Sequence, residues 1–312
     1  MILRTEGLTK VFETGLRKKV NAVEDLDLAV DANEIFGFVG PNGAGKTTTI
    51  KMLMGLIFPT RGKAYIFDAP IPSEAAKARL GYLPENPAYP DFLTGIEALR
   101  FFATLAGVPG SEQAKRCEEL LGLVGLSDAA GRQIRKYSKG MQQRLGIAQA
   151  LVSDPALVVL DEPMSGLDPI GRREMRDLML ELKRRGKTVF FSTHILPDVE
   201  TLCDRVGLIV RGRMRDTGRI GEMLSARVKS VELTALLPGG RREALGGARV
   251  LSADGDRVTA VFEDEASADA GVKAVLGAGG RIVSLSPNRE TLEDFFLRRL
   301  EEAAPAAAAS AG

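Results

Sequence analysis

The order of apolar and polar residues along the chain predicts where strands and helices lie. Residues 23–30, VEDLDLAV, alternate between apolar and polar side chains in their second half, which is typical of a half-exposed antiparallel strand. Four later segments are short and continuously apolar, which indicates strands buried on both faces of a sheet. These segments are residues 34–40, 156–162, 188–194 and 206–210.

Helical patterns separate these apolar runs. Residues 172–185 place four apolar side chains on one stripe, and Gly186 follows at a position suited to end the helix. The stripe consists of Met175, Leu178, Met179 and Leu182. Buried strands that alternate with such helices predict a mainly parallel α/β sheet.

The pattern changes twice more along the chain. Between about residues 86 and 136 several helical segments are broken by Gly and Pro, which predicts a helical insertion in the α/β domain. After residue 220, strand patterns such as RVTAVFED mix with helical ones such as TLEDFFLRRL. We expect an α/β domain over residues 1–220 with a helical subdomain at about 86–155, a small α+β domain over 225–302, and a disordered low-complexity tail over 303–312.

Composition narrows the classes of function. The chain has 312 residues, enough for about two domains. Its 42 Lys and Arg nearly cancel its 41 Asp and Glu, so the overall charge does not suggest nucleic acid or an anionic membrane as a partner. Apolar runs are far shorter than the ~18 residues of a membrane span, and the start, MILRTEGLTK, lacks a signal-peptide core, so we expect a cytosolic chain. Cys117 and Cys203 lie on apolar helical faces and are interpreted as core residues.

Residues 40–47, GPNGAGKT, fit the P-loop pattern. They follow an apolar strand and open an amphipathic helix, which is the strand, loop and helix order that a P-loop needs. The alternative is a plain glycine turn with an exposed lysine. Context favours phosphate binding.

The residue types suit that chemistry. Gly40, Gly43 and Gly45 let backbone N–H groups turn toward phosphate oxygens where a side chain would clash. Lys46 supplies a charge for the β- and γ-phosphates, and the Thr47 hydroxyl is placed to bind Mg²⁺. The predicted ligand is therefore a nucleoside triphosphate with Mg²⁺.

A second acidic element follows the strand at 156–162. Asp161 is predicted to bind Mg²⁺, directly or through water, and Glu162 to polarise the attacking water. The alternative is that one of these carboxylates only caps a helix. The P-loop upstream favours the metal-binding interpretation.

Three further motifs make residues 1–220 resemble the nucleotide-binding subunits of ABC transporters. YSKGMQQRLGIAQAL at 137–151 is similar to the family's signature motif, SGLDP at 165–169 to its D-loop, and FSTH at 191–194 to its switch histidine. GPNGAGKT resembles Walker A and LVVLDEP resembles Walker B. The resemblance implies a P-loop ATPase fold of the ABC type, with antiparallel N-terminal strands, a helical subdomain and a small α+β C-terminal domain.

The resemblance also implies a head-to-tail dimer that holds two ATP molecules between its protomers. Each ATP would contact the P-loop of one chain and the signature residues of the other, although Ser138 is equally suited to be only a helix N-cap. Phe12 corresponds to an aromatic residue that stacks on adenine, and its alternative is a place in the core. The implied ATP-binding residues are Phe12, Gly40, Pro41, Asn42, Gly43, Ala44, Gly45, Lys46, Thr47, Thr48, Ser138, Gly140 and Asp168.

The sequence departs from the commonest family pattern at two places. Glu85 stands where many relatives have a glutamine that reaches Mg²⁺, and a carboxylate can also bind this ion. Lys139 and Met141 replace Gly and Gln in the signature motif. Both departures, and the C-terminal PNRETLEDFFLRRL, resemble the branch that exports drugs, polyketide antibiotics and Na⁺. The implied metal ligands are Thr47, Asp161 and Glu85.

His194 is the only histidine in the chain. No cysteine or second histidine lies beside it at a metal-binding spacing, so a metal site is not expected there. Its place in FSTH implies a polar link between the γ-phosphate, Glu162 and the opposing D-loop, and the alternative is a ring that only packs. The implied catalytic residues are Glu162, His194 and Glu85.

The sequence therefore predicts an ATPase subunit that powers an ABC exporter. Its partners would be a second copy or close homologue and a polytopic membrane permease, which would hold it at the inner face of the cell membrane. Glu85 and the helical insertion that follows are the expected contact with that permease. The alternatives are a soluble ABC-type ATPase that remodels ribosomes or DNA and a regulatory ATP-binding module. The cargo and the role of the C-terminal domain stay open.

Overall fold

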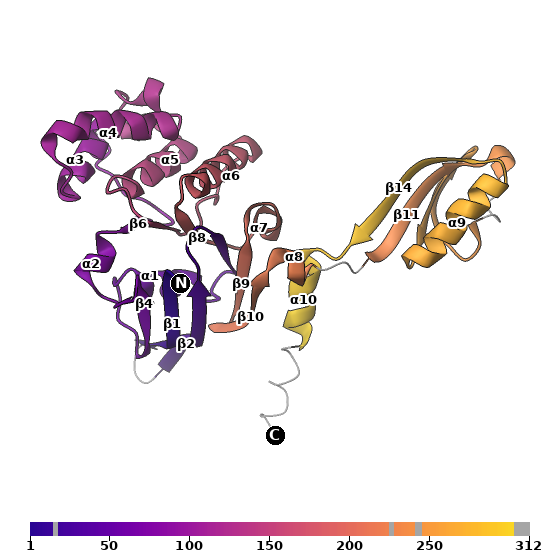
Figure 1. Ribbon diagram of the computed structural model, residues 1–312, viewed down its shortest axis with the longest axis horizontal. Coiled ribbons are helices and arrows are strands. Elements are labelled where there is room, and N and C mark those ends of the chain that lie inside the picture. The colour runs from indigo at the N-terminus through magenta and orange to yellow at the C-terminus, as the bar shows by residue number, and fades with distance from the viewer. Residues whose placement is uncertain (15–17, 225–227, 241–244, 303–312) are drawn as a thin grey trace. The chain divides into compact units, whose positions relative to one another are not determined.

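The computed structural model describes residues 1–14, 18–224, 228–240 and 245–302 (Figure 1). The chain forms two compact units, Met1–Ile220 and Gly221–Gly312, which are treated separately below. The tail at 303–312, expected to be disordered, lies outside the described residues.

A six-stranded sheet forms the centre of the first unit, with the strand order β10-β9-β3-β8-β7-β6. Its strands are β3 (Ile35–Val39), β6 (Leu80–Leu83), β7 (Leu157–Leu160), β8 (Thr188–Thr193), β9 (Arg205–Val210) and β10 (Arg213–Arg219). Neighbours from β9 to β6 are parallel, and only β10 is antiparallel to its partner. The side chains of β3, β7 and β8 are buried throughout, so the prediction of strands covered on both faces is confirmed.

A four-stranded antiparallel sheet lies beside it, in the order β2-β1-β4-β5. The strands are β1 (Leu3–Thr14), β2 (Lys18–Val30), β4 (Arg61–Ile66) and β5 (Ala69–Pro70). In the predicted segment 23–30, Leu26 and Leu28 are buried whereas Asp25 and Asp27 are exposed. One hydrophobic core joins this sheet, α1 (Lys46–Leu53) and the central strands.

The segment between β6 and β7 is helical. It contains α3 (Gly95–Leu105), α4 (Gly110–Leu123) and α5 (Lys139–Ala150), which lie together at one end of the first unit (Figure 1). Thr94 and Glu97 form a capping box that starts α3. The short α2 (Glu74–Lys77) precedes β6.

Two more helices pack in the first unit, α6 (Pro169–Arg184) and α7 (Leu196–Leu202). The predicted stripe of α6 is buried from Met175 to Leu182, and Gly186 adopts a left-handed φ of +78° just after the helix. Both cysteines are free thiols. Cys117 is buried in α4, and burial raises the pKa of Cys203, whose sulfur packs against Gly37 of β3.

The second unit is a small α+β structure. Its sheet has the order β12-β13-β11-β14, and the short α8 (Ile220–Met223) lies at the boundary of the units. The elements are β11 (Val228–Leu236), β12 (Arg249–Asp254), β13 (Arg257–Phe262), α9 (Glu265–Gly277), β14 (Arg281–Arg289) and α10 (Leu292–Glu302). Its core is formed by apolar residues of the sheet and α9. The sequence pattern did not reveal β12, because this edge strand exposes nearly all of its side chains and shifts register between Val250 and Ser252.

Candidate active site

The loop between β3 and α1 forms a narrow cradle that requires glycine. A Cβ atom on Gly40 would lie 2.2 Å from the carbonyl oxygen of Ile209. Gly45, the residue before α1, has a φ of +107°, and its Cβ would lie 2.5 Å from the carbonyl oxygen of Ala22. The tip of the loop, Pro41 to Gly43, is exposed, whereas Ala44 is buried beneath it. The loop therefore presents backbone to solvent at the start of a helix, the arrangement that binds phosphate.

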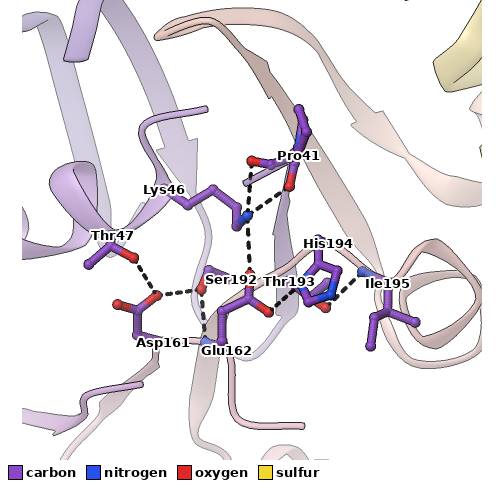
Figure 2. A network of polar contacts seen from close by, with 10 residues as sticks. Pro41, Lys46, Thr47, Asp161, Glu162, Ser192, Thr193, His194 and Ile195 are labelled. Carbon is purple, nitrogen blue, oxygen red and sulfur yellow. Dashed lines mark hydrogen bonds and ion pairs between the residues drawn. The ribbon is translucent and has the colours of Figure 1, made fainter. Parts of the chain in front are cut away.

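Lys46 is 6% exposed and folds back over this loop. Its Nζ donates hydrogen bonds to the carbonyl oxygens of Gly40 at 2.7 Å and Pro41 at 3.3 Å, and lies 3.1 Å from Oε1 of Glu162 (Figure 2). The ammonium is thus buried with a carboxylate partner, as a buried charge requires. The alternative of an exposed lysine on a plain turn does not describe this site.

Asp161 follows β7 and is 1% exposed. Its Oδ1 accepts hydrogen bonds from the hydroxyls of Thr47 at 3.4 Å and Ser192 at 2.6 Å. Its Oδ2 is buried and has no hydrogen-bond partner among the described residues. Burial raises the pKa of Asp161, while the Ser192 and Thr47 hydroxyls lower it and the charges of Glu85 and Glu162 raise it. A cation at Oδ2 would stabilise the ionised carboxylate.

Glu162 lies between the side chains of Lys46 and His194. Its Oε2 is 3.0 Å from Nδ1 of His194, and its other oxygen is the partner of Lys46 (Figure 2). Glu162 has a φ of +49°, which is uncommon outside glycine. Neither acid caps α6, because Asp168 does so. The His194 side chain is 42% exposed, so its ring lies at the surface of the site rather than in the core.

The signature and D-loop residues lie near one another in the first unit. Ser138 caps α5 by accepting a hydrogen bond from the N–H of Met141 at 3.3 Å, and Asp168 caps α6 by accepting one from Gly171 at 2.7 Å. These two helix starts, with Gly140, line a cavity of about 370 Å³. The hydrogen bonds described for Ser138 and Asp168 do not reach the P-loop within one chain.

Phe12 and Glu85 make fewer contacts with the other predicted site residues. Phe12, in β1, is 38% exposed and lies under the ammonium of Lys10 at 5.1 Å, so its ring is not a core residue. Glu85 follows β6 and is exposed, and its carbonyl accepts a hydrogen bond from the buried Gln143 of α5 at 3.1 Å. Its carboxylate acts on Asp161 through charge, but the described contacts include no hydrogen bond between these acids. Thr48 is half-buried in α1.

The sequence analysis missed Ser192 and Gln143. Ser192 is fully buried in β8 and touches both acids of the site, and Gln143 is 1% exposed. In the sequence Ser192 is only a polar residue within an apolar run, and Gln143 is only a polar residue in a helical segment. Neither pattern reveals the hydrogen-bond partner.

A parallel sheet with a phosphate cradle after one strand and two acids after another defines a P-loop nucleotide-hydrolysing protein. A model of the ABC transporter family matches residues 23–165. An uncharacterised ABC transporter ATP-binding protein of Synechocystis is 41% identical over 306 residues, which cover 96% of this chain and 85% of that protein.

A second relative matches the chain, and a solved structure shares its fold. The fluoroquinolones export ATP-binding protein of Mycobacterium tuberculosis is 42% identical over 217 residues, covering 68% of this chain and 69% of that protein. A solved dimeric ATP-binding cassette, in a post-hydrolysis state with ADP and Pi, has a TM-score of 0.65 at 23% identity and covers 70% of this chain and 99% of its own. The chain belongs to the ATP-binding proteins of ABC transporters and carries an ABC-type ATPase domain.

Proposed function

We propose that this chain binds and hydrolyses ATP with Mg²⁺ as the motor subunit of an ABC exporter. The observation that supports this most directly is the position of Glu162 between Lys46 and His194. When ATP enters, its phosphates would replace Glu162 as partners of Lys46. Glu162, still held by His194, would then be free to accept a proton from the attacking water.

The residues present fit a magnesium ion. Within the described ranges no three His, Cys, Asp or Glu side chains gather as a metal cluster, so the chain itself offers few ligands. Thr47 and the unpartnered Oδ2 of Asp161 are oxygen donors of the kind that Mg²⁺ binds together with nucleotide phosphates. When bound, the ion would neutralise charge on the phosphates. Glu85 is proposed as a further ligand on the basis of the family resemblance.

The signature residues require a partner chain. Ser138 and Asp168 are both exposed, and their cavity is separate from the P-loop. The start of α5 carries free N–H groups suited to a γ-phosphate. We therefore propose a dimer, since the similarly folded cassette is dimeric. In this proposal the protomers pack head to tail, and α5 of one protomer completes the ATP site of the other.

Mixing two inactive variants tests this arrangement. Lys46→Ala disables the P-loop, and Ser138→Arg blocks the start of α5. Each variant alone is expected to release no phosphate, whereas a mixture regains turnover because one heterodimeric site pairs an intact P-loop with an intact signature. No regain on mixing would place the whole site in one chain and contradict the dimer.

An exposed aromatic surface supports a membrane partner. Phe92, Phe101 and Leu105, in and before α3, are 66%, 51% and 68% exposed. Phe101 and Leu105 are four residues apart in α3 and therefore share one face of the helix, and a contiguous exposed apolar face is typical of protein interfaces. Among the residues that the structure describes, no helix has the length and apolar character to cross a bilayer. We propose that this surface and Glu85 bind a polytopic permease, which places the chain at the inner face of the cell membrane.

Export is proposed from the name of the Mycobacterium relative. The permease contact is tested by capturing the polytopic membrane protein that co-purifies with this chain from membranes. Phe101→Glu should abolish capture, whereas Leu180→Glu, at a 38% exposed position on α6, should not. Equal capture by both variants would remove the α3 surface from the proposed interface.

A further inference from the structure

Ser192 is a polar residue in the most buried part of the sheet. It lies near the end of β8, after Phe190 and Phe191, and has no exposed surface. A hydroxyl in such a place is unfavourable unless it is hydrogen-bonded. The Ser192 hydroxyl both donates and accepts a hydrogen bond, and its two partners are Asp161 and Glu162 of the proposed ATP site.

The direction of each hydrogen bond follows from its donor. The backbone N–H of Glu162 donates to Oγ of Ser192 at 2.9 Å, so this oxygen is the acceptor. The single hydroxyl proton of Ser192 then points to Oδ1 of Asp161 at 2.6 Å. One side chain, in a strand next to that of the acids, thus holds the backbone of one acid and the carboxylate of the other (Figure 2).

Both constraints matter to the site. Glu162 has a left-handed φ of +49°, a conformation that needs support from its surroundings. The bond to Asp161 occupies Oδ1, and Oδ2 has no hydrogen-bond partner in the part of the chain that the structure describes. Without Ser192, Glu162 could relax away from Lys46 and His194, and Asp161 could rotate.

We propose that Ser192 is a positioning residue that fixes Glu162 for water activation and Asp161 for the metal. This inference rests on the proposed hydrolysis of ATP with Mg²⁺. Ser192 itself does not touch the reacting atoms.

The test compares two strand positions that each bury one hydroxyl. Ser192→Ala removes the link to the acids. Thr188→Ala, at the opposite end of β8, removes a hydroxyl that accepts a hydrogen bond from the N–H of Asn33 at 2.8 Å and contacts neither acid. Both variants should melt at lower temperature than the parent.

Only Ser192→Ala should alter the site. We expect kcat to fall by about tenfold or more, consistent with the loss of a buried hydrogen bond at the reaction centre, while KM for ATP changes less than about threefold. A second readout does not need turnover. ATP should still raise the melting temperature in EDTA, because Lys46 and the cradle are intact, but the additional rise on titrating Mg²⁺ should need about tenfold more Mg²⁺.

Ser192→Thr keeps the hydroxyl and adds a methyl group in a filled core. It should melt at lower temperature but recover kcat and the Mg²⁺ dependence of the parent, since these follow the hydroxyl rather than the packing. Parental kcat and Mg²⁺ dependence in Ser192→Ala would overturn the proposal. A parent that binds ATP but releases no phosphate would instead overturn the proposed function, and the Mg²⁺ titration would still test Ser192.

Discussion

The two units of the chain use polar residues in opposite ways. In the first unit, buried polar side chains from distant segments meet at one place, including Lys46, Asp161, Glu162 and Ser192. In the second unit the described core is apolar, and Thr234, at 5% exposure, is the one buried polar residue among the described residues of that unit. Polar contacts there are mainly helix caps and surface ion pairs, such as Asp264 before α9.

This difference separates a unit built for chemistry from one built for packing. Burying charges is unfavourable, so a cluster of buried charged groups is kept only where they pair with one another or await a ligand. The second unit shows no such cluster in its described residues, and its helices and strands follow from burial alone. Changes in the two units should therefore have different kinds of effect.

The largest effect is expected for Glu162→Gln. Turnover should fall by about 100- to 10,000-fold, since the amide cannot act as a base, while ATP binding is retained because Lys46 loses a competing partner. A phosphate-release assay and a thermal shift with ATP measure the two properties. Glu181→Gln makes the same change on the surface of α6 and should leave both unchanged. Parental turnover in Glu162→Gln would remove this residue from its role.

Phe262→Ala should act on stability alone. Its ring is 4% exposed in the core of the second unit, and truncation of a buried Phe costs about 3–5 kcal/mol. We expect the second unit to unfold at a lower temperature, while ATP still stabilises the first unit. Circular dichroism and limited proteolysis measure the unfolding. Leu285→Ala, at a 46% exposed position, should cost less than about 1 kcal/mol. Loss of ATP binding in Phe262→Ala would show that the units are not separable in this way.

His194→Ala should have a smaller effect than Glu162→Gln. The ring makes one hydrogen bond to a carboxylate, and such bonds are worth about 1.5–3 kcal/mol, or about 10- to 100-fold in rate. The melting temperature should fall less than in Phe262→Ala, because the side chain is 42% exposed. Steady-state hydrolysis at saturating ATP measures the effect. If the variant is as fast as the parent, His194 only packs.

The smallest effect concerns Asp294. The hydrogen bond from Lys229, together with those from the backbone N–H and the hydroxyl of Thr291, lowers the pKa of this carboxyl from 3.8 to about 2. A depressed pKa stabilises the folded state above the unfolded value, and this contribution is lost as the pH falls from about 4 toward 2. Both side chains are more than a third exposed, so the pair is worth at most about 1 kcal/mol.

Lys229→Met tests that pair. The difference in stability between the parent and this variant, measured by denaturant unfolding, should be largest near neutral pH and vanish at low pH. A difference that stays constant with pH would mean that Lys229 contributes by packing.

The sequence predicted those elements whose burial requires apolar residues at regular positions. Continuous apolar runs revealed β3, β7, β8 and β9, because strands buried on both faces need apolar residues at nearly every position. An apolar stripe revealed α6, because a helix buried on one face needs apolar residues only along that face. The exposed edge strand β12 left no such pattern. The motifs located Lys46, Asp161 and Glu162, but the pairing of Lys46 with Glu162 and the bonds of Ser192 depend on which strands are neighbours. Periodicity does not specify that order.

Strand order also has a consequence for how the protein folds during synthesis. The P-loop follows β3 and the two acids follow β7, yet these strands are not neighbours, because β8 lies between them. A ribosome that has made residues 1–165 has produced both motifs without the strand that bridges them. In the growing chain β3 and β7 cannot be joined in one sheet until residues 188–193 emerge and pair with both of them. An ATP analogue should therefore protect nascent chains from protease only after two later strands have left the exit tunnel: β8, and β9, against whose Ile209 the cradle packs.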